Sequence, residues 1–140
     1  MDTTATETIS LDNPDLYLNR ELSLLEFNWR VLQQASDPSV PLLERLNYLC
    51  ISSTNLDEFF EVRVAGLVQQ IELGDPYLEA DKITAQEALK LVNVRAHELV
   101  EEQYRVLNEV LVPELEQQAI QVLPRASWTE EQTEWLRDYF

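Results

Sequence analysis

The sequence has little cysteine, histidine or glycine. Of its 140 residues, one is cysteine, one is histidine and two are glycine. A single cysteine excludes an internal disulfide and a cysteine metal cluster. Because Cys50 stands between Leu49 and Ile51, we expect it to be a buried structural thiol. With only Gly66 and Gly74 available, the chain has no glycine-rich phosphate loop.

Basic residues and long apolar runs are also scarce. Ten Lys and Arg residues against 26 Asp and Glu give a formal net charge of −16. Such a chain repels phosphate backbones and anionic membrane surfaces, so nucleic acid is not an expected partner. No apolar run reaches the length of a transmembrane segment, and residues 1–16 lack the features of a signal peptide. We expect a cytoplasmic location, or a peripheral one at the inner membrane face.

Leucine, glutamate, glutamine and alanine are plentiful, and these residues favour helices. The expected class is all-α, with three long helices in an antiparallel bundle similar to a spectrin repeat. We expect a disordered or frayed arm over residues 1–16 and the bundle over residues 17–119. A connector strand and the start of a further helix are expected over residues 120–140. That last helix has no C-terminal stop signal, so we expect it to be truncated in a fragment of a longer protein.

Capping motifs and prolines predict where the helices begin and end. Ser23 to Glu26 has the form of a capping box for the first helix, and Pro38 ends that helix. A second helix is expected from Pro41 to Gly74, and a third from the capping box at residues 84–87. Pro113 is expected to kink or stop the third helix, and residues 129–132 cap the last one. The predicted inward faces of the three helices are Leu22, Leu25, Trp29 and Leu32; Leu42, Leu46 and Leu49, followed by an apolar stripe of Phe60, Val64, Leu67 and Ile71; and Leu89, Val92, Ala96, Leu99, Leu107 and Leu111.

The run over residues 52–67 is the most informative part of the chain. Asn55 either begins a new helix as its N-cap or lies inside one long helix. Its amide offers both a donor and an acceptor, which suits an adenine edge or a ribose hydroxyl. From the chemistry of the residue alone, the cap is the favoured interpretation.

Acidic residues and the lone histidine are weaker candidates for chemistry. Asp57, Glu58 and Glu61 could bind a hard cation or act in acid–base catalysis. The favoured interpretation is that they occupy a first helical turn and are stabilised by the helix dipole. His97 begins an incomplete zinc motif, because Glu101 stands where the second histidine would be. We therefore expect His97 to be a surface residue.

Other residues of this region have structural interpretations. Phe59, Phe60 and Val64 are expected in the core because they follow helical spacing. Gly66 costs about 1 kcal/mol relative to alanine inside a helix, and its expected return is close approach of another helix or a partner domain. Arg45 and Arg63 could meet carboxylates or a phosphate, and surface ion pairing is the expected use of each.

Several motifs in order resemble the long-chain polyphosphate kinases, the first of the two polyphosphate kinase families. The resemblance begins with residues 19–32 and continues over residues 37–46. Its most specific part is Asn-Leu-Asp-Glu-Phe-Phe at residues 55–60, followed by Val-Arg-Val-Ala-Gly-Leu at residues 62–67. Residues 131–140 also match, whereas residues 75–110 carry little motif information. Two positions depart from the pattern, with Leu24 where tryptophan is usual and Trp29 where a polar residue is common, which predicts altered packing on the first helix.

The resemblance implies a multidomain enzyme that reversibly moves the terminal phosphate of ATP onto polyphosphate through a phosphohistidine, with Mg²⁺. Its catalytic histidines and its metal lie in later domains, so no catalytic or metal residue is expected in this fragment, which is predicted to be inactive alone. The resemblance assigns nucleotide binding to Asn55, on the adenine side of the ATP/ADP site. It implies partners in the remaining domains, a homo-oligomer, and polyphosphate bound elsewhere. The alternative is a non-catalytic docking or oligomerisation module.

Overall fold

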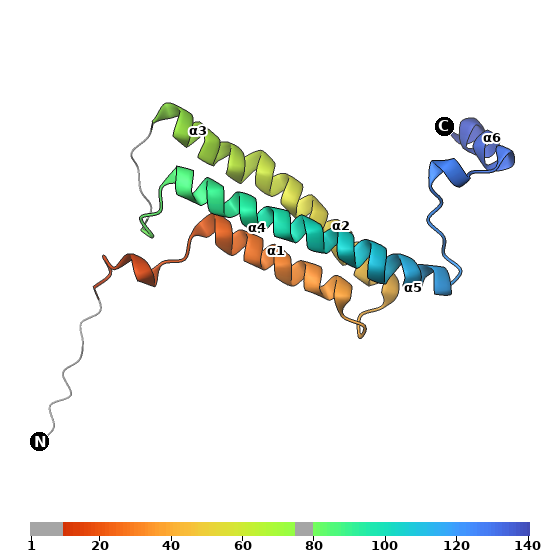
Figure 1. The fold of residues 1–140 in the computed structure, drawn as a ribbon, viewed down its shortest axis with the longest axis horizontal. Coiled ribbons are helices and arrows are strands. Elements are labelled where there is room, and N and C mark those ends of the chain that lie inside the picture. The colour runs from red at the N-terminus through yellow and green to blue at the C-terminus, as the bar shows by residue number, and fades with distance from the viewer. Residues whose placement is uncertain (1–9, 75–79) are drawn as a thin grey trace, which may run out of the picture.

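The computed structural model describes residues 10–74 and 80–140, and these residues form an all-α structure without strands. Three long helical segments pack together, and each runs back along the one before it (Figure 1). The first segment is α1 (Arg20–Ser36). The second joins α2 (Leu42–Glu58), the π-helix η2 (Phe59–Val64) and α3 (Ala65–Leu73). The third joins α4 (Ala85–Arg105), the π-helix η3 (Val106–Leu111) and α5 (Val112–Gln117).

The residues after α5 lie outside the bundle. A 3-10 helix, η4 (Arg125–Ser127), leads to α6 (Glu130–Tyr139), which has no buried residue and stands apart from the other helices (Figure 1). The strand expected at the start of residues 120–140 is wrong, because residues 120–124 have no regular structure. A strand needs a neighbouring strand to accept its hydrogen bonds, and the described residues provide none.

Of the arm expected over residues 1–16, residues 1–9 lie outside the described residues. The remainder contains a 3-10 helix, η1 (Pro14–Leu16), capped by the side chain of Asn13. The hydroxyl of Tyr17 also donates to the carbonyl oxygen of Leu11 over 2.8 Å. This part of the arm is therefore locally structured.

Most of the predicted helix ends are confirmed. The capping boxes Thr84/Glu87 and Thr129/Gln132 are both present, and Gly74 ends α3 with φ of 64°. The capping box expected at Ser23 is wrong, because α1 begins at Arg20. Its N-cap is Asn19, whose side chain accepts from the Leu22 amide over 3.1 Å. Asn19 also donates to Asp81 over 2.9 Å, a contact that ties this end of α1 to the loop before α4.

The core lies where the three segments face one another. The residues predicted to point inward from the first and third helices, and Leu42, Leu46, Leu49 and Val64 of the second, lie in this core or pack against it. The rest of the stripe predicted on the second helix, Leu67 and Ile71 as well as Phe60, is not part of this core. The buried apolar residues that form one connected cluster are Leu25, Leu32, Ala35, Leu49, Leu56, Phe59, Val64, Val92, Ala96, Leu99, Val106 and Leu111. Two other expectations are wrong: Phe60 is 38% exposed, and Cys50 is exposed rather than buried. The prediction for Cys50 is wrong because its apolar neighbours Leu49 and Ile51 lie on different faces of α2, one buried and one exposed. Apolar neighbours in sequence therefore do not predict the burial of the residue between them.

Pro113 is expected either to kink or to stop the third helix, and the helix does not stop there, because α5 follows η3 directly. Proline lacks an amide hydrogen, and its ring clashes with the carbonyl group four residues earlier in a regular helix. Here the wide turn of η3 comes directly before it, and the Val112 amide donates to the Leu107 carbonyl oxygen, five residues back. Pro113 then lies in the first turn of α5, where no amide hydrogen is needed.

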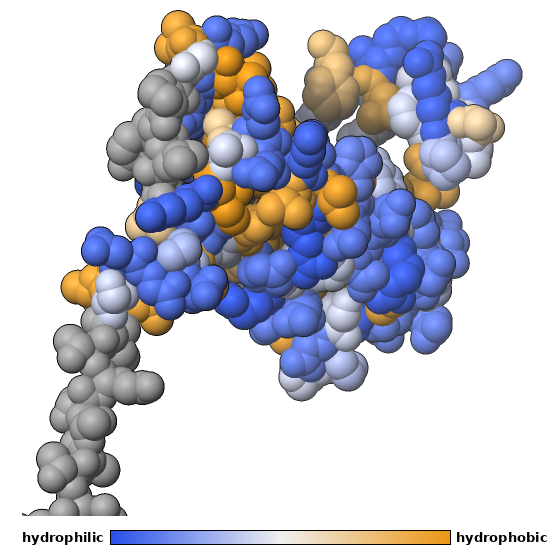
Figure 2. Space-filling model, turned by 60° about the vertical axis from the view of Figure 1, so that its left-hand side comes forward, coloured by the Kyte–Doolittle hydropathy of each residue, from blue (hydrophilic) through white to orange (hydrophobic). Residues whose placement is uncertain are grey.

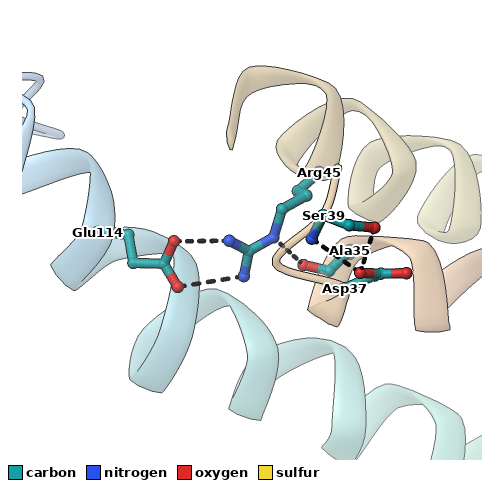
Figure 3. Close-up of polar contacts among 5 residues, drawn as sticks. All are labelled: Ala35, Asp37, Ser39, Arg45 and Glu114. Atoms are coloured by element: carbon teal, nitrogen blue, oxygen red, sulfur yellow. Dashed lines mark hydrogen bonds and ion pairs between the residues drawn. The ribbon is translucent and has the colours of Figure 1, made fainter. Parts of the chain in front are cut away.

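Arg45 is buried rather than on the surface, with a relative exposure of 3%. Its guanidinium donates to both carboxylate oxygens of Glu114, over 2.6 and 3.2 Å, and to the Ala35 carbonyl oxygen over 2.9 Å (Figure 3). The Ala35 carbonyl is one of those left without an amide partner at the end of α1. Arg45 therefore joins the end of α1, the start of α2 and α5 at one end of the bundle.

The surface remains partly apolar. Figure 2 shows apolar side chains among hydrophilic ones toward the end of the bundle that holds α3. In α3, Val68 is 38% exposed and Leu73 is 75% exposed. Within residues 10–74 and 80–140, no helix combines the length and the apolar character needed to cross a lipid bilayer.

Candidate functional site

A pocket of about 290 Å³ opens between α1 and the helix formed by α2 and η2. Its walls are mostly apolar, with two side-chain amides and two charged side chains among them. The lining residues are Leu24, Leu25, Phe27, Asn28, Asn55, Glu58, Phe59, Val62 and Arg63. This pocket contains Asn55, the one residue to which nucleotide binding is assigned from the sequence.

Asn55 lies inside an unbroken helix and is not an N-cap. The chain is helical without interruption from Leu42 to Leu73, so the break considered near residues 52–55 is absent. Asn55 is half-buried, and its side-chain Nδ2 donates to Oδ1 of Asn28 over 3.4 Å. Helix capping therefore does not explain an asparagine here, where leucine or alanine would be better helix formers.

Asn28 connects Asn55 to a buried polar chain that crosses the bundle. The Asn28 amide is 3% exposed and donates to the backbone carbonyl oxygen of Ser52 over 2.9 Å. The Ser52 hydroxyl, which is fully buried, accepts from Nε2 of Gln103 in α4 over 3.0 Å. Buried polar groups are stabilising only when they are paired, and each of these amides has a partner.

The π-helix brings Arg63 to the same face as Asn55. A regular α-helix turns about 100° per residue, so a separation of eight residues would place Arg63 about 80° away from Asn55. A π turn accommodates one extra residue, so that this spacing acts as seven residues and the offset shrinks to about 20°. The burial pattern agrees, because the buried residues Phe59 and Val64 are five apart. The same wide turn rotates Phe60 away from the buried face on which Val64 lies, so the side chain of Phe60 is exposed.

The charged residues of this region do not behave as expected from the sequence. Arg63 is half-buried and forms no ion pair with any residue in the described part of the chain. Asp57, Glu58 and Glu61 are exposed in the middle of a continuous helix, so stabilisation by a helix N-terminus is excluded for them. Glu58 lines the pocket, whereas Asp57 lines a second pocket on the other side of α2.

The second pocket, of about 400 Å³, lies between α2 and α4. Gln103, Cys50 and Tyr104 are among its lining residues. The chain of hydrogen bonds from Asn55 through Asn28 and Ser52 to Gln103 thus runs between the two pockets. Among the residues that the structure describes, no group of three or more His, Cys, Asp and Glu side chains could hold a metal ion.

His97 and Gly66 lie away from this pocket. His97 is exposed, as expected, and its Nδ1 lies 2.7 Å from the Asn93 carbonyl oxygen one turn earlier. Gly66 is also exposed. Apart from its two chain neighbours and the nearby backbone of its own helix, no atom of the described residues lies within 4 Å of the Cβ position that it leaves empty. Close approach of another helix within residues 10–74 and 80–140 therefore does not explain Gly66.

The two unusual positions of α1 have different environments. Leu24 lines the pocket and is 38% exposed. Trp29 packs against the core beneath Arg95, whose guanidinium carbon lies 4.4 Å from the centre of the indole ring. Arg95 also pairs with Glu26 of α1, and its hydrogen bonds hold the pKa of the Glu26 carboxyl below the usual value. The indole of Trp29 thus stabilises the α1–α4 contact, whereas Leu24 and Phe27 are the apolar side chains that face the pocket from the same helix.

Comparison with known proteins supports the resemblance seen in the motifs. A family model described as the polyphosphate kinase N-terminal domain matches residues 17–123. The chain belongs to this family. It is 54% identical over 123 residues to the polyphosphate kinase of Burkholderia cenocepacia and 50% identical over 130 residues to that of Pseudomonas putida. These matches cover 88% and 93% of this chain but 18% of each relative's length. No solved structure matches the chain significantly.

Three residues around the polyphosphate kinase motif were not singled out from the sequence. Asn28, Ser52 and Gln103 each occupy an inward position of an apolar stripe, as shown by Asn28 between Leu25 and Leu32. A polar residue at such a position signals a buried hydrogen bond. The sequence does not show which residue of another helix is the partner in that hydrogen bond, because the partner depends on the tertiary structure.

Proposed function

We propose that this chain is the N-terminal domain of an enzyme that reversibly transfers the terminal phosphate of ATP to polyphosphate. In this proposal the domain contributes Asn55 to the adenine side of the ATP site. The observation that carries the proposal is the position of Asn55. Its side chain lines the pocket, and it lies within an uninterrupted helix, where it has no capping role. Membership of the polyphosphate kinase N-terminal family supports the reaction.

The chemistry of the pocket suits a nucleobase. One amide hydrogen of Asn55 goes to Asn28, which leaves the other hydrogen and the carbonyl oxygen for a ligand. An asparagine amide pairs with adenine by accepting from its amino group and donating to a ring nitrogen. The side chains of Phe27, Phe59 and Val62 supply apolar walls for a flat ring.

Arg63 addresses the electrostatic difficulty of binding ATP to so acidic a chain. A formal charge of −16 repels a polyanion. Arg63 contributes the one positive charge among the residues that line the pocket, where Glu58 contributes a negative one, and it forms no ion pair with a carboxylate of the described residues. We propose that it faces the nucleotide and offsets this repulsion locally.

The remaining parts of the reaction are assigned to the rest of the protein. The chain spans 18% of the length of the polyphosphate kinases that it matches. In this proposal the phosphohistidine, the Mg²⁺ site and the polyphosphate path belong to the other domains of the enzyme. This domain contacts those domains, and the whole enzyme is a homo-oligomer. The exposed His97 has no catalytic role in this proposal.

The test is steady-state kinetics of the full-length enzyme with the substitution Asn55→Ala. Loss of one hydrogen bond costs about 0.5–1.5 kcal/mol, so the Michaelis constant for ATP should rise roughly 2- to 13-fold. The thermal unfolding temperature should be unchanged, because Asn55 is half-buried and has one weak partner. Thr54→Ala is the matched control, since Thr54 is the neighbouring exposed polar residue and does not line the pocket.

An unchanged Michaelis constant in Asn55→Ala would contradict the assignment of Asn55. An equal rise in both variants would indicate damage to α2 instead of a lost contact. Absence of polyphosphate synthesis by the unaltered enzyme would contradict the proposed reaction itself.

A docking or oligomerisation module is the second candidate, and Gly66 favours it. Glycine inside a helix costs about 1 kcal/mol, and no described part of this chain uses the space that it leaves. A partner domain or a second subunit that approaches the helix backbone at Gly66 would explain that cost. This function is compatible with a contribution to the ATP site.

A further inference from the structure

We propose that Asn28 is a positioning residue that fixes the orientation of the Asn55 amide and thereby makes the pocket prefer adenine over guanine. The inference rests on the proposed function, because it concerns the same pocket. It is carried by two hydrogen bonds, from Asn28 to the Ser52 carbonyl oxygen over 2.9 Å and from Asn55 to Asn28 over 3.4 Å.

The orientation is set by a backbone group that cannot change its role. A carbonyl oxygen only accepts hydrogen bonds, so the side chain of Asn28 must turn its NH₂ group toward Ser52. The Oδ1 atom of Asn28 then points the other way, toward Asn55. Rotating the Asn28 amide by half a turn would place two oxygen atoms in contact, which is repulsive in this buried position.

The orientation of the Asn28 amide in turn sets the orientation of the Asn55 amide. Because Oδ1 of Asn28 only accepts, Asn55 must turn its own NH₂ group toward it. The Oδ1 atom of Asn55 is then held on the side away from Asn28. A free asparagine amide presents its oxygen and its nitrogen interchangeably, whereas this one is fixed in one orientation.

A fixed orientation distinguishes the two purines. Adenine carries an amino group beside an acceptor nitrogen, and the oxygen and remaining amide hydrogen of Asn55 complement that pair. Guanine carries a carbonyl oxygen at the same place, beside an N–H donor. An amide that could turn over would accept either base, but a fixed amide sets its oxygen against the oxygen of guanine.

The surroundings of Asn28 keep this orientation in place. Asn28 is 3% exposed and Ser52 is fully buried, so water does not compete for their hydrogen bond. Both helices at the contact are continuous, and α1 packs along α2. Specificity thus depends on a residue that need not touch the adenine edge itself.

The experiment compares kcat/KM for ATP and for GTP in the full-length enzyme. Asn28→Leu keeps a similar volume and removes the orienting amide, and Asn28→Ala is a second variant should leucine not fit. The ratio of the two values should fall roughly 2- to 13-fold, the effect of one hydrogen bond. The fall should come from weaker use of ATP with GTP unchanged or improved, and a merely structural role would lower both together.

Ser52→Ala is the matched control. It removes the buried bond to Gln103 but keeps the Ser52 backbone carbonyl, so Asn28 and Asn55 remain oriented. We expect Ser52→Ala to lower the thermal unfolding temperature while the ratio of ATP to GTP use stays that of the unaltered enzyme.

The outcomes separate this inference from the proposed function. If Asn55→Ala weakens ATP use but Asn28→Leu and Asn28→Ala leave the ratio unchanged, the positioning role is overturned and the ATP site stands. An equal loss for ATP and GTP in the Asn28 variants also overturns it. If Asn55→Ala has no effect on ATP use, the proposed site fails first and the inference fails with it.

Discussion

Arg45 illustrates how a charged residue can hold helices together from a buried position. Its side chain is 4% exposed, whereas that of its partner Glu114 is 41% exposed. The pair is therefore asymmetric, since water can solvate the carboxylate but not the guanidinium. Removing one partner of a buried pair leaves the other charge without compensation, which costs more than the pair contributes.

We predict that Glu114→Ala lowers the free energy of unfolding of the 140-residue chain by about 1–3 kcal/mol, because it leaves a buried charge partly unpaired. The double variant Arg45→Met/Glu114→Ala should lose less than the sum of the two single losses. Urea denaturation of the single and double variants measures the free energies of unfolding that these two predictions compare.

Glu102→Ala serves as the control for that prediction. It removes the partner of Arg105 on the surface of α4, where the guanidinium remains exposed to water. Its effect should stay within about 0.5 kcal/mol. Equal losses for Glu114→Ala and Glu102→Ala would show that the burial of Arg45 has no energetic consequence.

At the scale of the helix, the two π turns govern how sequence spacing becomes a surface. Each turn shifts the buried positions from spacings of three and four to a spacing of five, from Phe59 to Val64 and from Val106 to Leu111. The first turn brings Arg63 to the pocket, and the second precedes Pro113. The register of the second and third helical segments therefore changes part-way along their length, whereas α1 has no such turn.

We predict that Gly66→Ala raises the free energy of unfolding of the chain by about 1 kcal/mol, the difference in helix propensity. Beyond its two chain neighbours and the nearby backbone of its own helix, the added Cβ meets no atom of the described residues within 4 Å. Gly74→Ala is the matched control, because Gly74 has equally open surroundings but a φ of 64°. It should destabilise the chain by about 1 kcal/mol, and urea denaturation compares the two.

In the full-length enzyme the larger substitution Gly66→Leu tests docking at the same position. If a partner approaches the helix there, the variant should shift from assembled to smaller species in size measurements by light scattering. An intact assembly with Gly66→Leu would contradict the docking candidate, while leaving the helix-propensity prediction untouched.

At the scale of the whole molecule, charge repulsion opposes folding. The chain carries 26 acidic and 10 basic residues, and the ion pairs of its described part involve Arg45, Arg95 and Arg105. Surface ion pairs contribute at most about 1 kcal/mol each. Repulsion among the excess carboxylates is spread over the surface and acts whenever the chain is compact.

We predict that raising NaCl from about 20 mM to about 300 mM stabilises the chain by about 1 kcal/mol, because the screening length falls below the spacing of distant charges. The midpoint of urea denaturation measures this change. KCl should have the same effect as NaCl, which would distinguish screening from binding of one cation. A lower midpoint at high salt would show that the ion pairs outweigh the repulsion.

Local patterns account for what could be predicted of this protein. The all-α class, the inward faces of the first and third long helices and of the start of the second, the capping boxes at Thr84 and Thr129 and the end at Gly74 depend on residues near one another in the chain. The motif around Asn55 likewise identified the family, because a motif is a local feature. The errors at Ser23 and Cys50 arose where local rules allow two outcomes.

The sequence by itself determined the helices, most of their inward faces and the family. Only the tertiary structure decided that Arg45 is buried against Glu114, that a π turn carries Arg63 to the face of Asn55, and that the Asn55 amide donates to Asn28. Helix spacing and capping follow from interactions within a few residues. Burial, register shifts and the orientation of an amide depend on which side chains from distant parts of the chain meet across the core.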